Sequence, residues 1–156
     1  MSIKELRMSL GLTQLEASSV VHIPLRTYKN YENDVKKRDT IKYAHILKTL
    51  EVYGRIDEEH GILTLEAIKN GVEDVFSDYQ IDFCYLFGSY AEKTPNEKSD
   101  VDLLVSTNLT GLKFFGLVEK LRTTIKKRVD VLTMNQLESN SKLIAEILKH
   151  GIKIYG

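Results

Sequence analysis

The stretch LFGSYAEKTPNEKSDVDLLV at residues 86–105 joins two apolar segments through a polar loop. The first segment ends in Gly88-Ser89, and the second opens with Asp100 and Asp102, which are separated by one residue. Because successive side chains of a β-strand point to opposite faces, both aspartates are expected on the same face. Two carboxylates so close together repel each other unless a cation lies between them. The stretch therefore predicts a strand–loop–strand unit with a site for a hard divalent ion such as Mg²⁺.

A third carboxylate lies further along the chain. Asp130 stands between two valines in RVDVLT, a segment with the composition of another strand. An unpaired charge would be costly to bury there. If this strand lies beside the one that carries Asp102, Asp130 joins the other two carboxylates on one face. Three carboxylates can hold two metal ions, which stabilise the attacking and leaving oxygens in phosphoryl or nucleotidyl transfer.

The Gly-Ser pair predicts a site for a phosphate. Gly88 allows the backbone to turn sharply and lets a bulky ligand approach closely. Ser89 can begin a short helix, whose free N–H groups and dipole favour an anion. We therefore expect phosphate binding at one end of residues 86–105 and metal binding at the other.

On both sides of this stretch, apolar runs alternate with amphipathic segments. Helices are expected at 63–79, 111–128 and 136–151, and strands at 81–87, 101–107, 129–134 and 152–155. Strands separated by helices predict an α/β layer fold with a small mixed sheet.

Residues 1–55 have a different pattern, with apolar residues at helical spacing and short polar turns, and they predict four or five short helices. Thr13 followed by Glu16 forms a capping box for the second of these. A fourth helix is expected to begin after an Asp39 cap. Its inward face is expected to contain Ile41, Ala44, Leu47 and Leu50. The polar segment at residues 56–61 is predicted to be a linker.

The composition agrees with two modules that have different partners. The 156 residues are 42% hydrophobic and 28% charged, which is typical of a globular chain, and the net charge of zero excludes a general polyanion binder. Residues 1–56 carry ten Lys and Arg against six Asp and Glu, whereas residues 57–156 carry twelve against sixteen. The single cysteine, Cys84, excludes an internal disulfide and is expected to be a buried thiol. Neither a signal peptide nor a membrane-spanning run is recognisable, so we expect a cytoplasmic protein without membrane contact.

The segment LGLTQLEASSVVHIPLRTYKNYEN at residues 10–33 resembles the helix-turn-helix of the Cro/repressor (XRE) family. The resemblance implies that residues 1–55 bind operator DNA, with the third helix in the major groove. It implies DNA contacts for Gln14, near the phosphates, and for Arg26, Thr27, Lys29 and Asn30 on the third helix. A solvated basic helix face or a protein-binding module remains an alternative. Tight binding would require a dimer that bridges two half-sites.

Gly88-Ser89, ten residues and then Asp100-Val101-Asp102 resemble the signature of the nucleotidyltransferase superfamily related to DNA polymerase β. The compact module at residues 62–156 is similar to the minimal nucleotidyltransferases (MNT). The resemblance implies that Gly88, Ser89 and Lys93 bind the triphosphate of ATP, and that Asp100 and Asp102 bind two Mg²⁺ ions. It also implies that Asp130 is the base for the attacking hydroxyl or a further metal ligand. Many members have Arg-Gly or Lys-Gly after the alanine, whereas this chain has Glu92-Lys93.

Together these features predict an α plus α/β chain: a helix-turn-helix domain of four or five helices at 1–55, a linker at 56–61, and a nucleotidyltransferase-type mixed sheet packed with helices at 62–156. Such a chain resembles the antitoxin of HEPN–MNT toxin–antitoxin pairs. The resemblance implies AMP transfer from ATP to a tyrosine of a HEPN ribonuclease toxin, autoregulation at the operator, and a homo-oligomer or a hetero-oligomer with the toxin. One alternative is a non-catalytic antitoxin and repressor that neutralises its toxin by binding. Another is a nucleotidyltransferase that acts on RNA or on a small-molecule hydroxyl.

Overall fold

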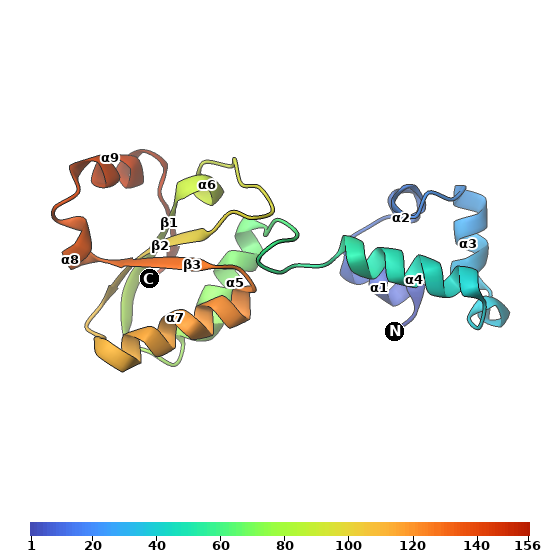
Figure 1. Ribbon diagram of the computed structural model, residues 1–156, viewed down its shortest axis with the longest axis horizontal. Helices are drawn as coiled ribbons and strands as arrows, with labels where there is room; N and C mark the ends of the chain where they lie inside the picture. Colours follow the sequence, from blue (N-terminus) through green and yellow to red (C-terminus); the bar gives the residue numbers. More distant parts are fainter. The chain divides into compact units, whose positions relative to one another are not determined.

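The computed structural model describes residues 1–156, which form two compact units, Met1–Arg55 and Ile56–Gly156 (Figure 1). The first unit is entirely helical. Its elements are α1 (Ile3–Ser9), α2 (Gln14–Val20), α3 (Leu25–Asn33), the 3₁₀ turn η1 (Val35–Lys37) and α4 (Ile41–Tyr53). The predicted capping box of α2 is present, because Thr13 Oγ1 accepts a hydrogen bond from Glu16 N and the Glu16 side chain accepts one from Thr13 N.

The inward face of α4 agrees only in part with the predicted one, because Leu50 is buried and Leu47 packs against the core as predicted, whereas Ala44 is exposed. The helix is capped by Thr40 rather than by Asp39, and Ile41, expected inside, is 90% exposed. The buried residues are Tyr43, Ile46 and Leu50. The predicted and the observed inward residues both have the spacing of a helix, so the sequence pattern alone does not choose between them. A contact with α1 does, because the Tyr43 hydroxyl accepts a buried hydrogen bond from Ile3 N at 3.0 Å.

A buried ion pair joins α1 and α3. Arg7 donates two hydrogen bonds to the Glu32 carboxylate, each of 2.9 Å, and a third to the carbonyl of Leu12. The side chains of Arg7 and Glu32 are only 14% and 1% exposed. Although burial favours the neutral acid, hydrogen bonds from Arg7 and Gln14 lower the pKa of Glu32. The three helices α1, α2 and α3 are therefore held together by one charged group inside a small core.

The second unit is a four-stranded mixed sheet with helices on both faces. Its strands are β1 (Ile81–Phe87), β2 (Val101–Thr107), β3 (Val129–Thr133) and β4 (Ile152–Tyr155), in the spatial order β3-β2-β1-β4. β2 and β3 are parallel, and β1 is antiparallel to both β2 and β4. The mixed sheet confirms the predicted fold class for this unit, and β1, β2 and β4 have the predicted bounds. Its helices are α5 (Leu65–Phe76), α6 (Gly88–Ala91), α7 (Gly111–Ile125), α8 (Met134–Leu137) and α9 (Ser141–His150).

The single helix predicted at 136–151 is two helices. α8 begins directly after β3, where Thr133 and Gln136 form a capping box. The chain then breaks, and α9 starts again at a cap from Asn140, whose side chain accepts a hydrogen bond from Leu143 N at 3.1 Å. An asparagine within an amphipathic run can continue a helix or cap a new one, and here the cap is formed.

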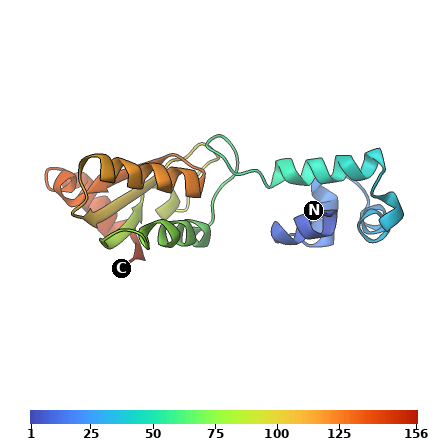
Figure 2. The same ribbon diagram turned by 90° about the horizontal axis from the view of Figure 1, so that it is seen from below.

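The two faces of the sheet have separate apolar layers. One layer packs the sheet against α5 and α7 and contains Ile68, Leu86, Leu103 and Leu121, among others. Cys84 is part of this layer as a free, fully buried thiol, as predicted, and burial raises its pKa to about 12. Figure 2, which is seen from this side, shows α5 (green) and α7 (orange) side by side.

The opposite layer is formed by Phe87 and Leu104 of the sheet with Leu137 of α8 and Ile147 of α9. Asp102 and Leu104 are two residues apart on β2, so their side chains point to the same face of the sheet. This face is the one covered by α9, which is drawn above the strands in Figure 1. No helix of the chain is long and apolar enough to cross a membrane.

Candidate active site

The structure brings Asp102 and Asp130 together on adjacent strands. They are register partners on the parallel pair β2 and β3. Their neighbours Val101, Leu103 and Val129 are buried in the layer under α5 and α7, so the two carboxylates stand on the opposite face. Asp102 is half-buried and Asp130 is exposed.

Asp100 directly precedes β2 and is half-buried. The turn before it is closed by three hydrogen bonds between Asn96 and residues 98–99. Asn96 N donates to Ser99 Oγ at 2.8 Å, Ser99 N to the Asn96 carbonyl at 3.1 Å, and Lys98 N to Asn96 Oδ1 at 2.8 Å. Val101 N then donates to the carbonyl of Arg128 at 2.9 Å, which begins the pairing with β3.

The Gly-Ser pair lies against the same carboxylate. β1 runs directly into α6, and its last residue, Phe87, is the register partner of Asp102. Gly88 adopts a φ of +71°, and a β-carbon built there would lie 2.1 Å from Asp102 Oδ2. Ser89 follows within α6, and its carbonyl accepts a hydrogen bond from Thr94 N at 2.9 Å. The two ends of residues 86–105 therefore meet at one place.

The carboxylates repel one another in this arrangement. The pKa of Asp102 is raised to about 6, first by burial and then by the negative charges of Asp130, Asp100 and Glu146. Glu146 belongs to α9 and was not singled out from the sequence. No local pattern distinguishes it from the other charged residues of an amphipathic helix, because the packing of α9 over the sheet brings it to this face.

The donor set fits a hard cation in its chemistry, because Asp100, Asp102 and Asp130 offer oxygen ligands whose mutual repulsion a divalent ion would relieve. Their side chains are not assembled for it, however. No group of three or more His, Cys, Asp or Glu side chains stands close enough together to hold a metal ion. These residues therefore suit Mg²⁺ held by one or two carboxylates together with phosphate oxygens rather than a closed cage of protein ligands.

Glu92-Lys93 stands where many members of the resembled superfamily have Arg-Gly or Lys-Gly, and this difference has a structural consequence. Glu92 ends α6 and lies 3.7 Å from Nε2 of His150, at the end of α9. Lys93 adopts a φ of +61°, in the left-handed region that favours glycine. A glycine at the position of Lys93 would therefore suit the backbone better than the lysine does.

The predicted DNA-contacting residues lie in the first unit, on α2 and α3. Arg26, Lys29 and Asn30 are exposed on α3, and Thr27 is half-exposed. Gln14, at the start of α2, donates a hydrogen bond of 3.1 Å to Glu32. Its amide is thus partly engaged within the unit, while the α3 side chains are free to meet solvent.

Residues 70–156 match the family model described as polymerase beta, nucleotidyltransferase, and the chain belongs to this family. A more specific likeness is to the putative protein adenylyltransferase MJ1215 of Methanocaldococcus jannaschii. The two are 31% identical over 74 residues, which cover 46% of this chain and 86% of the relative.

Two solved structures show a partial likeness to this chain. One is a crystal structure of a toxin–antitoxin with AMP-PNP, with 26% identity, coverage of 56% of this chain and 73% of the other, and a TM-score of 0.47. The second contains a tri-AMPylated HEPN toxin of Shewanella oneidensis in complex with an MNT antitoxin. It shows 21% identity, coverage of 58% and 71%, and a TM-score of 0.44.

Proposed function

We propose that the second unit is a Mg²⁺-dependent nucleotidyltransferase that transfers AMP from ATP to a hydroxyl group of a partner protein. One observation carries this proposal: Gly88, Asp102 and Asp130 lie together at one site. The turn at Gly88 follows β1, and the two carboxylates come from the adjacent strands β2 and β3. Membership of the nucleotidyltransferase family and the likeness to a putative protein adenylyltransferase support it.

Each residue has a role in this proposal. The backbone at Gly88 and Ser89, with the Lys93 side chain, binds the triphosphate, and Asp100 and Asp102 hold Mg²⁺, with Asp130 as a further ligand or as the base. Bound Mg²⁺ would neutralise phosphate charge and polarise the α-phosphorus. The acceptor oxygen forms a bond to the α-phosphorus, the bond from this phosphorus to the bridging oxygen of the β-phosphate breaks, and pyrophosphate leaves. Asp130 takes the hydroxyl proton in this scheme.

The acceptor is proposed to be a tyrosine of a HEPN-type toxin. This part rests on the resemblance of residues 62–156 to minimal nucleotidyltransferases that act as antitoxins. Residues 56–156 form one compact unit with a four-stranded sheet and contain no second unit that could serve as an acceptor domain. A protein that brings its own acceptor surface fits it better than RNA or a small molecule.

The test of transfer uses labelled ATP, Mg²⁺ and the product of the neighbouring gene. Wild-type protein should label the partner, and Asp102→Ala and Asp130→Asn should not. Asp74→Ala, which removes an exposed carboxylate from α5, is the matched control and should label normally. If labelling is absent with wild type, or if Asp102→Ala labels equally well, the enzymatic proposal is wrong.

The alternative of neutralisation by binding alone gives a different result. A non-catalytic antitoxin would still protect cells from the toxin when it carries Asp102→Ala. A transferase would lose protection together with labelling. Growth of cells that express the toxin with each variant separates these two outcomes.

We further propose that the first unit binds operator DNA through α3. The exposed Arg26, Lys29 and Asn30 supply two cations and an amide on one short helix, which is suited to phosphate and base contacts. Arg26→Ala and Lys29→Ala should weaken binding to the promoter fragment and reduce its salt dependence, whereas Lys69→Ala on α5 should change neither. Equal binding by all three variants would exclude α3 as the DNA-contacting helix.

A further inference from the structure

Lys127 is a lysine with no exposed surface, at the junction of α7 and β3. Its Nζ donates hydrogen bonds to two main-chain carbonyls, that of Glu97 at 2.6 Å and that of His60 at 3.1 Å. A buried ammonium is costly unless it is hydrogen-bonded. The two carbonyls also depend on Lys127, because an apolar side chain there would leave them without this donor.

The residue after Lys127 holds the other side of the same loop. The carbonyl of Arg128 accepts the hydrogen bond from Val101 N at 2.9 Å. Consecutive residues thus fix Glu97 and Val101, which lie on either side of Asp100. Glu97 itself lies within the turn closed by Asn96 and Ser99. The backbone that carries Asp100 is therefore tied at both ends to the segment 127–128.

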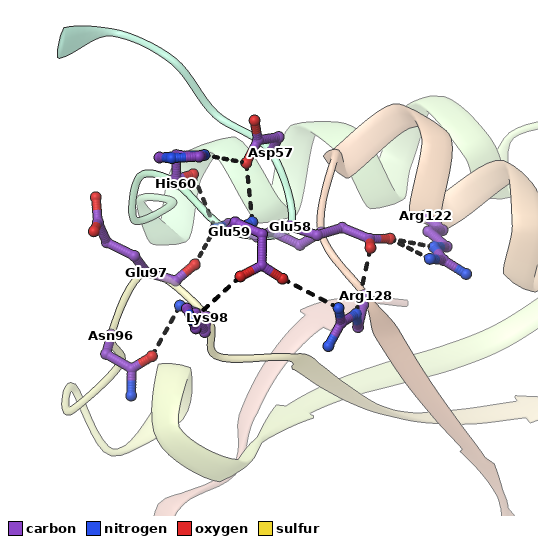
Figure 3. A network of polar contacts seen from close by, with 10 residues as sticks. Asp57, Glu58, Glu59, His60, Asn96, Glu97, Lys98, Arg122 and Arg128 are labelled. Atoms are coloured by element: carbon purple, nitrogen blue, oxygen red, sulfur yellow. Dashed lines mark hydrogen bonds and ion pairs between the residues drawn. The ribbon is translucent and has the colours of Figure 1, made fainter. Parts of the chain in front are cut away.

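The segment 57–61, which is part of the predicted linker at 56–61, packs against this loop, and Figure 3 shows its residues Asp57 to His60. Gly61 N donates to Glu97 Oε1 at 3.1 Å, and Lys98 Nζ lies 3.4 Å from a Glu59 carboxylate oxygen. Two of the three acidic residues of the segment also pair with arginines, Glu58 with Arg122 and Arg128, and Glu59 with Arg128. The exposed pairs contribute little individually. The contacts of Lys98 and Glu97, together with the buried Lys127, attach the segment to the loop that leads to Asp100, whereas the arginine pairs attach it to α7 and to the start of β3.

We infer that Lys127 is a positioning residue for Asp100. By holding the carbonyl of Glu97, it keeps the 96–99 turn in the one conformation that places Asp100 beside Asp102. By holding the carbonyl of His60, it ties that turn to the segment that directly follows the first unit in the chain. The inference rests on the proposed function for the metal-binding role of Asp100, but the anchoring of the loop is independent of it. It goes beyond that function by assigning a role to a residue outside the carboxylate cluster.

The anchoring is tested by hydrogen exchange in the full-length protein. Lys127→Met preserves most of the buried volume and removes the donor. We expect amide exchange at residues 96–101 and 60–61 to accelerate about tenfold or more, with the amides of β1 and α5 unchanged. Lys126→Met, at the adjacent exposed lysine, is the matched control and should exchange as wild type does.

A uniform acceleration throughout the second unit would show a merely structural role and overturn the inference, as would an unchanged loop. If Lys127→Met does not fold, Glu97→Ala provides a second test. It removes the side-chain acceptor of Gly61 N but keeps the main-chain carbonyl that Lys127 holds, so the amides at residues 60–61 and 96–101 should still open together with one common free energy. Independent opening of the two segments in Glu97→Ala would contradict the anchoring by Lys127.

The second measurement concerns the metal. In the AMP-transfer assay, Lys127→Met should raise the half-saturating Mg²⁺ concentration about tenfold while the rate at saturating Mg²⁺ changes much less. A fall in the saturated rate with an unchanged Mg²⁺ requirement would overturn the positioning role. If wild type transfers no AMP, the proposed function fails while the exchange experiment still decides whether Lys127 anchors the loop.

Discussion

Gly88 and the carboxylate of Asp102 are in direct contact: a β-carbon at residue 88 would lie 2.1 Å from Asp102 Oδ2 and 3.0 Å from its Cγ. The contact follows from the register, since Phe87, the residue before Gly88, is paired with Asp102 across β1 and β2. The turn proposed to bind phosphate and the strand proposed to bind the metal are thus one structural unit. Any side chain at residue 88 would displace Asp102.

We therefore expect Gly88→Ala to abolish AMP transfer. The variant adds a methyl group against Asp102 and also places a side chain at a φ of +71°, which costs about 1–2 kcal/mol in free energy of unfolding. The measurement is the transfer rate together with thermal unfolding. Gly116→Ala is the control, because a β-carbon there meets nothing within 4 Å and the residue lies in α7. Full activity in Gly88→Ala would show that the contact is not needed.

Asp102→Asn should stabilise the second unit at neutral pH. Burial and three neighbouring carboxylates raise the pKa of Asp102 to about 6, so its ionised form destabilises the folded state. The sign follows from linkage: the folded state binds the proton more tightly, so this destabilisation is absent below about pH 3.8, grows as pH rises, and is complete above about pH 6.

Thermal unfolding of wild type and Asp102→Asn at pH 4 and pH 7.5 measures this effect. The variant should unfold at a higher temperature at pH 7.5, and the two should converge at pH 4. Asp74→Asn, an exposed carboxylate on α5, should show no such pH dependence. A variant less stable than wild type at pH 7.5 would contradict the electrostatic strain assigned to Asp102.

Lys93→Gly should stabilise the protein by about 1 kcal/mol, because Lys93 occupies the left-handed region at a φ of +61°. Lys126, at the end of α7 with a φ of +63°, should respond in the same way. The contrasting substitution is Lys69→Gly in the interior of α5, which should cost about 1 kcal/mol. Chemical denaturation of the three variants checks this order, and a destabilised Lys93→Gly would show that the lysine side chain contributes more than its backbone costs.

Breaking the Arg7–Glu32 pair should unfold the first unit. Removing one partner leaves a buried charge without compensation, and Glu32→Ala should cost about 3–5 kcal/mol. Because hydrogen bonds lower the pKa of Glu32 despite its burial, the stabilisation is present at neutral pH and is lost as pH falls below the ordinary value of 4.5. Helical circular dichroism during denaturation is the measurement.

The double variant Arg7→Met with Glu32→Met provides the control. Replacing a buried ion pair by apolar side chains is often neutral or stabilising, so the double variant should be more stable than Glu32→Ala. A double variant as unstable as the single one would show that packing, rather than charge, explains the loss.

Much of the second unit could be predicted because its strands are short apolar runs with clear ends. β1, β2 and β4 lie where the pattern placed them. Asp130 was predicted on the face of Asp102 only on the condition that the two strands are neighbours, and the pairing of β2 with β3 meets that condition. The break between α8 and α9 could not be predicted, since Asn140 is compatible with either a cap or a continuous helix.

Local order along the chain thus determined the strands, the spacing of Gly88 from Asp100 and Asp102, and the chemistry that those residues can perform. The tertiary structure decided which side chains surround them. Glu146 reaches Asp102 because α9 packs across the sheet, and Lys127 holds Glu97 and His60 because α7 ends against two distant loops. Such contacts join residues 30 to 67 positions apart, and their energies depend on burial that exists only in the folded chain.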